Sequence, residues 1–210
     1  MISPMVYRRI AKRAKENNMR IPVNYREIIN CYKNVVKPGE DKIVFSWLYD
    51  TNSCLNANAM VHKCIIFNAE WAARIVLFDN LDTMNAFRDT IGHELTHKDK
   101  EFSRCKRSRK DRIFVARINE VHADFGAGPK MMGNRRDLIL QAIEYKKSLK
   151  KKDKESKLSS HPSWEKRYEY IKNYDFNRKL IERVAEDMGY TNAKLIDEID
   201  AFYDDIVLIK

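Results

Sequence analysis

Five consecutive residues, His93-Glu94-Leu95-Thr96-His97, constrain this 210-residue chain more than any other feature. Residues i and i+4 of an α-helix lie only about 40° apart around its axis, so both imidazoles would face the same side and could bind one metal ion. Glu94 would stand beside them, within reach of a metal-bound water. The pattern therefore predicts a helix here, and a neighbouring element that supplies a further ligand.

The next predicted helix offers that ligand in the stretch EVHAD at 120–124. Glu120 and Asp124 are four residues apart and share a face. Glu120 can bind a metal, whereas Asp124 can accept the outer N–H of a ligating imidazole and fix its tautomer. His122 is rotated by about 200° from Glu120, and we interpret it as a structural or surface histidine. A catalytic zinc usually has three protein ligands and one position open for water. We therefore expect one Zn²⁺ per chain, bound by His93, His97 and Glu120.

Patterning along the whole chain predicts an α+β fold, with a small N-terminal β-sheet packed on a mainly helical body. Ser3-Pro4 is typical of a helix start, and that helix should run to about Asn17, with a second helix after Asn24. Three runs rich in β-branched and aromatic residues predict strands at 42–49, 63–67 and 74–78. Apolar residues at helical spacing predict helices at 83–98, 111–125, 134–149, 162–188 and 193–208.

Length favours a single domain over residues 1–210. Its expected parts are N-terminal helices and a small sheet at 1–82, zinc-site helices at 83–128, a basic linker at 145–160 and C-terminal helices at 161–210. No window reaches the roughly 18 apolar residues that a membrane span needs, and the first residues do not form a signal peptide. The four cysteines form no CxxC pair and are interpreted as reduced thiols. These features predict a cytoplasmic protein.

The net charge of +10 is concentrated in two segments. Residues 98–111 carry seven Lys or Arg against three Asp or Glu, and residues 145–157 carry seven against two. Both are expected to be loops or helix ends, because neither keeps an apolar stripe. They could contact an acidic partner or nucleic acid; the alternative is a solvated surface without a partner.

Three blocks of the chain resemble a known family. HELTH at 93–97, EVHAD at 120–124 followed by Gly126, and SSHPSWEKR at 159–167 are similar to segments of the CAAX-prenyl-endopeptidase/HtpX-like zinc metallopeptidases. The resemblance implies a gluzincin, that is, a zincin-type body with zinc on two histidines and a later glutamate. It also implies that Glu94 is the general base and that His161 and Arg167 line the cleft near the scissile group.

Two other interpretations are kept open. Residues 21–30 and 74–78 also resemble ImmA/IrrE-type cytosolic metallopeptidases, which act on DNA-bound regulators and use HExxH with a later glutamate. The second alternative is a non-catalytic nucleic-acid-binding protein with a structural metal site, which would bind through the basic segments. A silent scaffold is disfavoured, because Glu94 is present although zinc binding does not need it.

The expected reaction is hydrolysis of a protein or peptide substrate. Glu94 would take a proton from a zinc-activated water and deliver it to the leaving amine. His161 is the first candidate for stabilising the oxyanion, with Arg167 second. His161 could instead hold the fourth zinc position in a resting state, or merely cap the following helix. Residues 55–60 could be an edge strand that pairs with the substrate, or an ordinary buried strand or loop.

Overall fold

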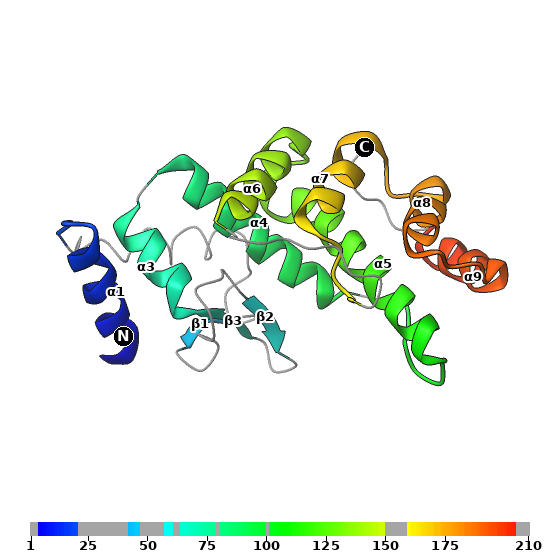
Figure 1. The fold of residues 1–210 in the computed structure, drawn as a ribbon, viewed down its shortest axis with the longest axis horizontal. Helices are drawn as coiled ribbons and strands as arrows, with labels where there is room; N and C mark the ends of the chain where they lie inside the picture. The colour runs from blue at the N-terminus through cyan, green and yellow to red at the C-terminus, as the bar shows by residue number, and fades with distance from the viewer. Residues whose placement is uncertain are drawn as a thin grey trace.

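The computed structural model describes seven stretches of the chain: residues 4–20, 42–46, 57–60, 64–78, 80–99, 101–149 and 159–204. Within them the fold is α+β, with eight α-helices and a small sheet (Figure 1). The helix expected after Asn24 and most of the linker at 145–160 lie outside the described residues. None of the described helices is long and apolar enough to cross a membrane. The described cysteines, Cys64 and Cys105, form no disulfide.

The sheet has three strands among the described residues: β1 (Lys42–Ser46), β2 (Ala57–Met60) and β3 (Cys64–Asn68). β3 lies in the middle, parallel to β1 and antiparallel to β2. Two of the three predicted strands are therefore confirmed. The sequence leaves residues 55–60 open between an edge strand and a buried strand or loop; from Ala57 onward they pair with β3 at an edge of the described sheet.

The strand predicted at 74–78 is wrong, because residues up to Leu77 belong to helix α3 (Ala69–Leu77). The helix starts directly after β3, where the Asn68 side chain accepts a hydrogen bond from the Trp71 N–H. Nearly every residue of α3 is buried, between the sheet and helix α1 (Pro4–Glu16). The last residues of this helix, 75–77, form a short apolar run like that of a buried strand, so periodicity does not separate the two.

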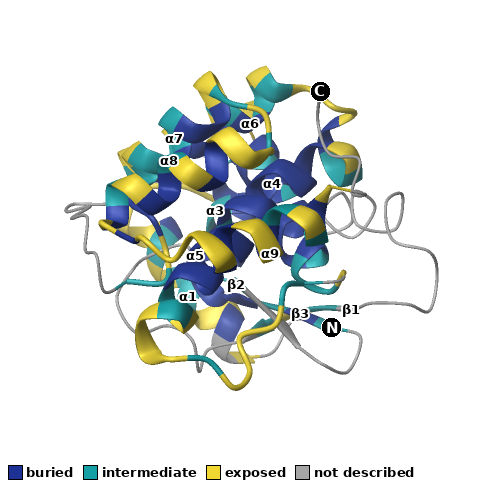
Figure 2. Cartoon of the chain, turned by 90° about the vertical axis from the view of Figure 1, so that its right-hand side faces the viewer, coloured by how far each residue is buried: buried dark blue, intermediate teal, exposed yellow. Residues whose placement is uncertain are grey.

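The central pair of helices is α4 (Leu81–His97) and α5 (Arg109–Ala127), which carry the HELTH and EVHAD stretches. Asn80 caps α4 and Ser108 caps α5, each accepting a backbone N–H through its side-chain oxygen. A π-helical turn, η1 (Gly128–Met132), follows α5 and leads into α6 (Arg136–Ser148). Figure 2 shows α4 and α5 as largely buried ribbons at the middle of the molecule.

Three shorter helices complete the C-terminal part: α7 (Trp164–Asn173), α8 (Arg178–Met188) and α9 (Ala193–Tyr203). The single helix predicted for 162–188 is wrong. It is broken after α7, and Asn177 starts α8 by accepting the N–H of Leu180. Gly189 ends α8 in a left-handed conformation, with φ of 63°, which glycine adopts without steric cost.

Two hydrophobic clusters flank the central helices. One joins α1, β3, α3 and the first half of α4, and the other joins α5 to α9. The two central helices approach each other closely at two glycines. A Cβ on Gly92 would lie 2.7 Å from the carbonyl oxygen of Ala127, and a Cβ on Gly126 would lie 2.4 Å from the Thr96 side chain. This close packing brings together the faces of α4 and α5 that carry His93, His97 and Glu120.

Candidate metal centre

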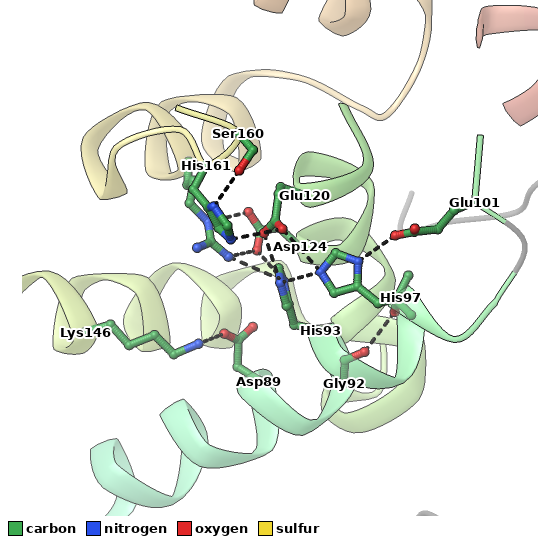
Figure 3. Close-up of polar contacts among 12 residues, drawn as sticks. Asp89, Gly92, His93, His97, Glu101, Glu120, Asp124, Lys146, Ser160 and His161 are labelled. Atoms are coloured by element: carbon green, nitrogen blue, oxygen red, sulfur yellow. Dashed lines mark hydrogen bonds and ion pairs between the residues drawn. The ribbon is translucent and has the colours of Figure 1, made fainter. Parts of the chain in front are cut away.

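The three ligands expected from the sequence converge at one point between α4 and α5 (Figure 3). The Nε2 atoms of His93 and His97 are 3.0 Å apart. The Glu120 carboxylate lies 3.4 Å from the first and 3.7 Å from the second. All three ligand atoms fall within 4.8 Å of one another, so this group could hold a metal ion.

The outer nitrogen of each histidine faces a carboxylate. Nδ1 of His93 is 2.9 Å from Oδ1 of Asp124, and Nδ1 of His97 is 2.6 Å from Oε1 of Glu101. An imidazole that donates its Nδ1–H to a carboxylate presents the lone pair of Nε2, which is the atom facing the centre. Asp124 lies where the sequence predicts it.

Glu101 was missed by sequence reasoning. It follows His97 by four residues, but α4 ends at His97, so helical spacing no longer says where its side chain points. The sequence shows two acidic residues just after the helix, Asp99 and Glu101, either of which could contact His97. The sequence does not tell which of the two does so. The turn after α4 makes the choice.

Arg167 lies behind His93. Its guanidinium donates to both Asp124 oxygens, through Nε to Oδ2 at 2.7 Å and through Nη2 to Oδ1. It also stacks over the Trp164 ring, at 4.1 Å from the centroid, and only 7 % of the residue is exposed. The structure thus places Arg167 as a support of the carboxylate that orients His93.

The ionisable side chains of the centre strongly influence one another's pKa values. Burial by itself would lower the pKa of His97, but the hydrogen bonds to Glu101 and Glu120 outweigh it and raise that pKa to about 10. Burial would raise the pKa of Glu120, yet contacts with His161, His93 and His97 lower that pKa well below its usual value. Glu120 is therefore ionised at neutral pH. Metal binding needs neutral imidazoles, so an incoming ion would displace a proton here.

Glu94 follows His93 on α4 and is 8 % exposed. Its negative charge is one of the contributions that raise the pKa of His97. The Glu94 carboxylate is therefore close enough to His97 to favour the protonated form of its imidazole.

His161 comes to the same centre from the segment before α7. Its Nε2 is 3.1 Å from Oε1 of Glu120, and its Nδ1 is 3.0 Å from Oγ of Ser160 (Figure 3). The side chain is 62 % exposed, so it lies at the outer side of the centre. The interpretation of His161 as a helix cap is wrong, because Ser163 caps α7 by accepting the N–H of Lys166.

His122 points away from the centre, as its spacing predicts. It is buried, with its ring 4.4 Å from the Tyr203 ring and 5.1 Å from the Phe176 ring. Burial lowers the pKa of His122 to about 4, so the ring is neutral at pH 7. It is a structural rather than a surface histidine.

A buried ion pair supports α4 one turn before His93. Nζ of Lys146, on α6, lies 2.5 Å from Oδ2 of Asp89, and both side chains are almost fully buried (Figure 3). Lys146 is counted in the basic segment 145–157, but it is a structural residue that joins α6 to α4.

The donor set of two imidazole nitrogens and one carboxylate oxygen suits a divalent transition metal, since imidazole is a ligand for zinc, copper, iron and nickel. No protein-family model, no curated protein and no solved structure matches this chain. The chemistry of the centre must therefore be inferred from its own residues.

Proposed function

We propose that the protein is a zinc-dependent metallopeptidase of the gluzincin type, with a zincin-type body. The observation that carries the proposal is the convergence of His93, His97 and Glu120, with Glu94 next to the first ligand. The three-block resemblance to the CAAX-prenyl-endopeptidase/HtpX-like family supports the same assignment. Its third block brings His161 and Arg167 to the centre, at Glu120 and Asp124 respectively.

The residues fit a zinc ion on chemical grounds. Three protein ligands of this kind leave one coordination position for water, as in catalytic zinc sites. Each histidine has its outer nitrogen held by a carboxylate, an arrangement that raises the basicity of the ligand and fixes its orientation. A bound zinc ion would lower the pKa of its water towards 7 and polarise the carbonyl of the scissile bond.

The chain's own groups supply the proton transfers. Glu94 would accept a proton from the attacking water and pass it to the leaving amine. His161, at the exposed side of the centre, would donate a hydrogen bond to the carbonyl oxygen as negative charge develops on it. Arg167 would act on the proposed ligand His93, both through Asp124 and through its own Nη2, which lies 3.3 Å from Nδ1 of His93, because its guanidinium is buried beside these two groups.

The proposed substrate is a protein or peptide in extended conformation. β2 lies at an edge of the described sheet, and an edge strand can pair with an added strand through its free backbone groups. That geometry supports the sequence-based expectation for residues 55–60 over the part that the structure describes.

Zinc content tests the assignment. We expect one zinc ion per wild-type chain, removable by a chelator and measurable by elemental mass spectrometry. His97→Ala should lose the ion, and Glu120→Gln should bind it more weakly. The matched control is Glu144→Gln, an exposed carboxylate on α6, which should keep full occupancy. A fully loaded His97→Ala variant would refute the ligand set.

Hydrolysis is assayed separately with a peptide library and an unfolded protein. Wild-type protein loaded with zinc should cleave, and the chelated protein should not until zinc is restored. A protein that holds zinc on these ligands but cleaves no substrate would point to the structural-site alternative.

A further inference from the structure

The position of Glu101 needs an explanation, because residues 101–104 belong to no helix or strand. Its carboxylate nevertheless lies 2.6 Å from Nδ1 of His97, and the side chain is only 22 % exposed. A side chain in an irregular segment has many accessible conformations, and fixing one costs conformational entropy. Something outside this segment has to hold it in place.

The next residue is held by a closed ring of three hydrogen bonds. The Phe102 N–H donates to Oη of Tyr203 at 3.2 Å, and the Phe102 carbonyl accepts from Nδ2 of Asn119 at 3.2 Å. Oη of Tyr203 in turn donates to Oδ1 of Asn119 at 2.9 Å. Asn119 and Tyr203 are 3 % and 4 % exposed. Buried groups that satisfy one another in this way resist rearrangement, because breaking one bond leaves buried partners unpaired.

Ring contacts hold the same residue from other sides. The Phe102 ring packs edge-on against Phe202 at 5.3 Å, and the Arg107 guanidinium lies 4.8 Å from its centroid. Tyr203 and Phe202 both belong to α9, and Asn119 directly precedes the ligand Glu120 on α5. The backbone after α4 is thus fixed simultaneously to the helix that carries the third ligand and to the C-terminal helix.

We infer that Asn119 and Tyr203 are positioning residues for the metal centre: they hold Glu101 on His97, so that α9 contributes to metal affinity without touching the metal. The inference rests on the metal site of the proposed function. Under this inference, the two histidines are oriented in the same way, each by a carboxylate that is fixed, directly or through a neighbouring residue, from another helix. Asp124 orients His93 and is held by Arg167 from α7, whereas Glu101 orients His97 and its neighbour Phe102 is held by Tyr203 from α9.

Zinc affinity, measured by competition with a chromophoric chelator, tests the inference. Tyr203→Phe removes one oxygen atom and should weaken zinc binding by about fivefold, as expected for loss of a buried hydrogen bond. Glu101→Ala should weaken binding by roughly 10–100-fold. Glu101→Gln keeps an acceptor oxygen and should rescue part of that loss.

The matched control is Tyr190→Phe. Tyr190 is also almost fully buried and donates its hydroxyl to a carboxylate, that of Asp111, away from the metal centre. This variant should bind zinc like the wild type even if it is less stable. Equal losses of zinc affinity in Tyr190→Phe and Tyr203→Phe would overturn the inference, since general destabilisation would then explain both.

A second measurement uses the metal-free protein. In wild type, the His97 Nδ1–H bonded to Glu101 should give a slowly exchanging, downfield proton resonance in NMR spectra. Tyr203→Phe should speed its exchange with water, and Glu101→Ala should remove it. Wild-type behaviour of Tyr203→Phe in both measurements would overturn the inference while leaving zinc binding intact. A wild-type protein without zinc affinity would overturn the proposed function, and with it this inference. If Glu101→Ala does not fold, Tyr203→Phe decides alone.

Discussion

At the scale of single residues, each histidine of the centre has two distinct nitrogens with two distinct tasks. Nε2 faces the partner ligands, and Nδ1 faces a carboxylate. This division explains why two acidic residues that bind no metal, Asp124 and Glu101, belong to the site. It also separates the three candidate ligands from Glu94, which is not part of this donor set and which we propose as the base.

The proposed role of Glu94 gives a first prediction. Glu94→Gln keeps the size of the side chain but removes the basic carboxylate, so hydrolysis should fall by roughly 10²-fold or more while zinc stays bound. Turnover per zinc-loaded molecule, with zinc content determined on the same sample, is the measurement. Wild-type turnover in this variant would mean that Glu94 is not the base.

His161 gives a second prediction. Since its Nε2 contacts Glu120 from the exposed side, His161→Ala should retain zinc but lose a donor to the developing oxyanion, with turnover falling about 10²-fold or more. Ser163→Ala, which removes the true cap of α7, serves as control and should affect stability rather than turnover. Increased turnover in His161→Ala would instead favour the resting-state role, in which this histidine blocks the fourth zinc position.

At the scale of elements, the close approach of α4 and α5 sets the distance between the histidines and Glu120. Two glycines make that approach possible. Gly92 faces the backbone of Ala127, and Gly126 faces the side chain of Thr96. The neighbour of Gly92 is a backbone, which cannot rotate out of the way as a side-chain end can.

Gly92→Ala should therefore push the helices apart. Alanine is intrinsically better than glycine in a helix by about 1 kcal/mol, but overpacking at a backbone contact typically costs roughly 1–3 kcal/mol. We expect a net loss of stability in chemical unfolding and weaker zinc binding, because α5 carries Glu120. A variant that is more stable and binds zinc like the wild type would show that the contact is not tight.

A hydrogen bond between elements gives a pH prediction. Tyr190, after α8, donates to Asp111 in the first turn of α5. This bond and those from Ser108 lower the pKa of Asp111, while burial and the same carboxylate raise the pKa of Tyr190. A lowered Asp pKa means that the contribution of the bond is present above about pH 3.9 and lost as pH falls. A raised Tyr pKa means that it is present below about pH 10 and lost as pH rises.

Tyr190→Phe should consequently lower the free energy of unfolding by about 1 kcal/mol or less at pH 7. The difference from wild type should shrink at pH 3. Urea unfolding of the metal-free proteins at both pH values measures it. A difference that does not change between pH 7 and pH 3 would contradict the assignment of the bond.

At the scale of the whole molecule, some of the side chains that carry the excess positive charge make contacts with other parts of the protein. Arg107 pairs with Glu198 at 3.2 Å, and Lys110 donates to the Gly189 carbonyl, so both tie the segment 98–111 to the C-terminal helices. Lys106 and Arg109 are exposed. The segment begins directly after His97 and includes Glu101, so its charge lies along the chain next to the candidate metal centre.

We expect Lys106→Gln combined with Arg109→Gln to weaken binding of an acidic peptide substrate without changing zinc content. The effect should fade as salt concentration rises, because exposed charges are screened over about 10 Å at 0.1 M. Lys179→Gln with Lys194→Gln, at exposed positions on α8 and α9, is the control. Identical affinities of both double variants at every salt concentration would favour a solvated surface without a partner.

Local periodicity was sufficient to predict which three residues come together in a group that could hold a metal ion. His93 and His97 are one turn apart on one helix, and Glu120 and Asp124 are one turn apart on another, so sequence spacing alone puts each pair on one face. The same rule predicted that the side chain of His122 points away from the face that carries Glu120 and Asp124. For the same reason the helices at 83–98, 111–125 and 134–149 were predictable, whereas the strand predicted at 74–78 belongs largely to α3, because the apolar run after Arg74 is too short to show a helical period.

Contacts between distant parts of the chain were decided only by the tertiary structure. Glu101 reaches His97 because Tyr203, about a hundred residues later, binds the neighbouring backbone, and Arg167 holds Asp124 from another helix. Lys146 is buried on Asp89, whereas the next residue, Lys147, is exposed. The spacing of residues along a helix determines the relative directions of side chains only within that helix. Which side chains meet across helices depends on how closely the helices pack, and here that depends on Gly92 and Gly126.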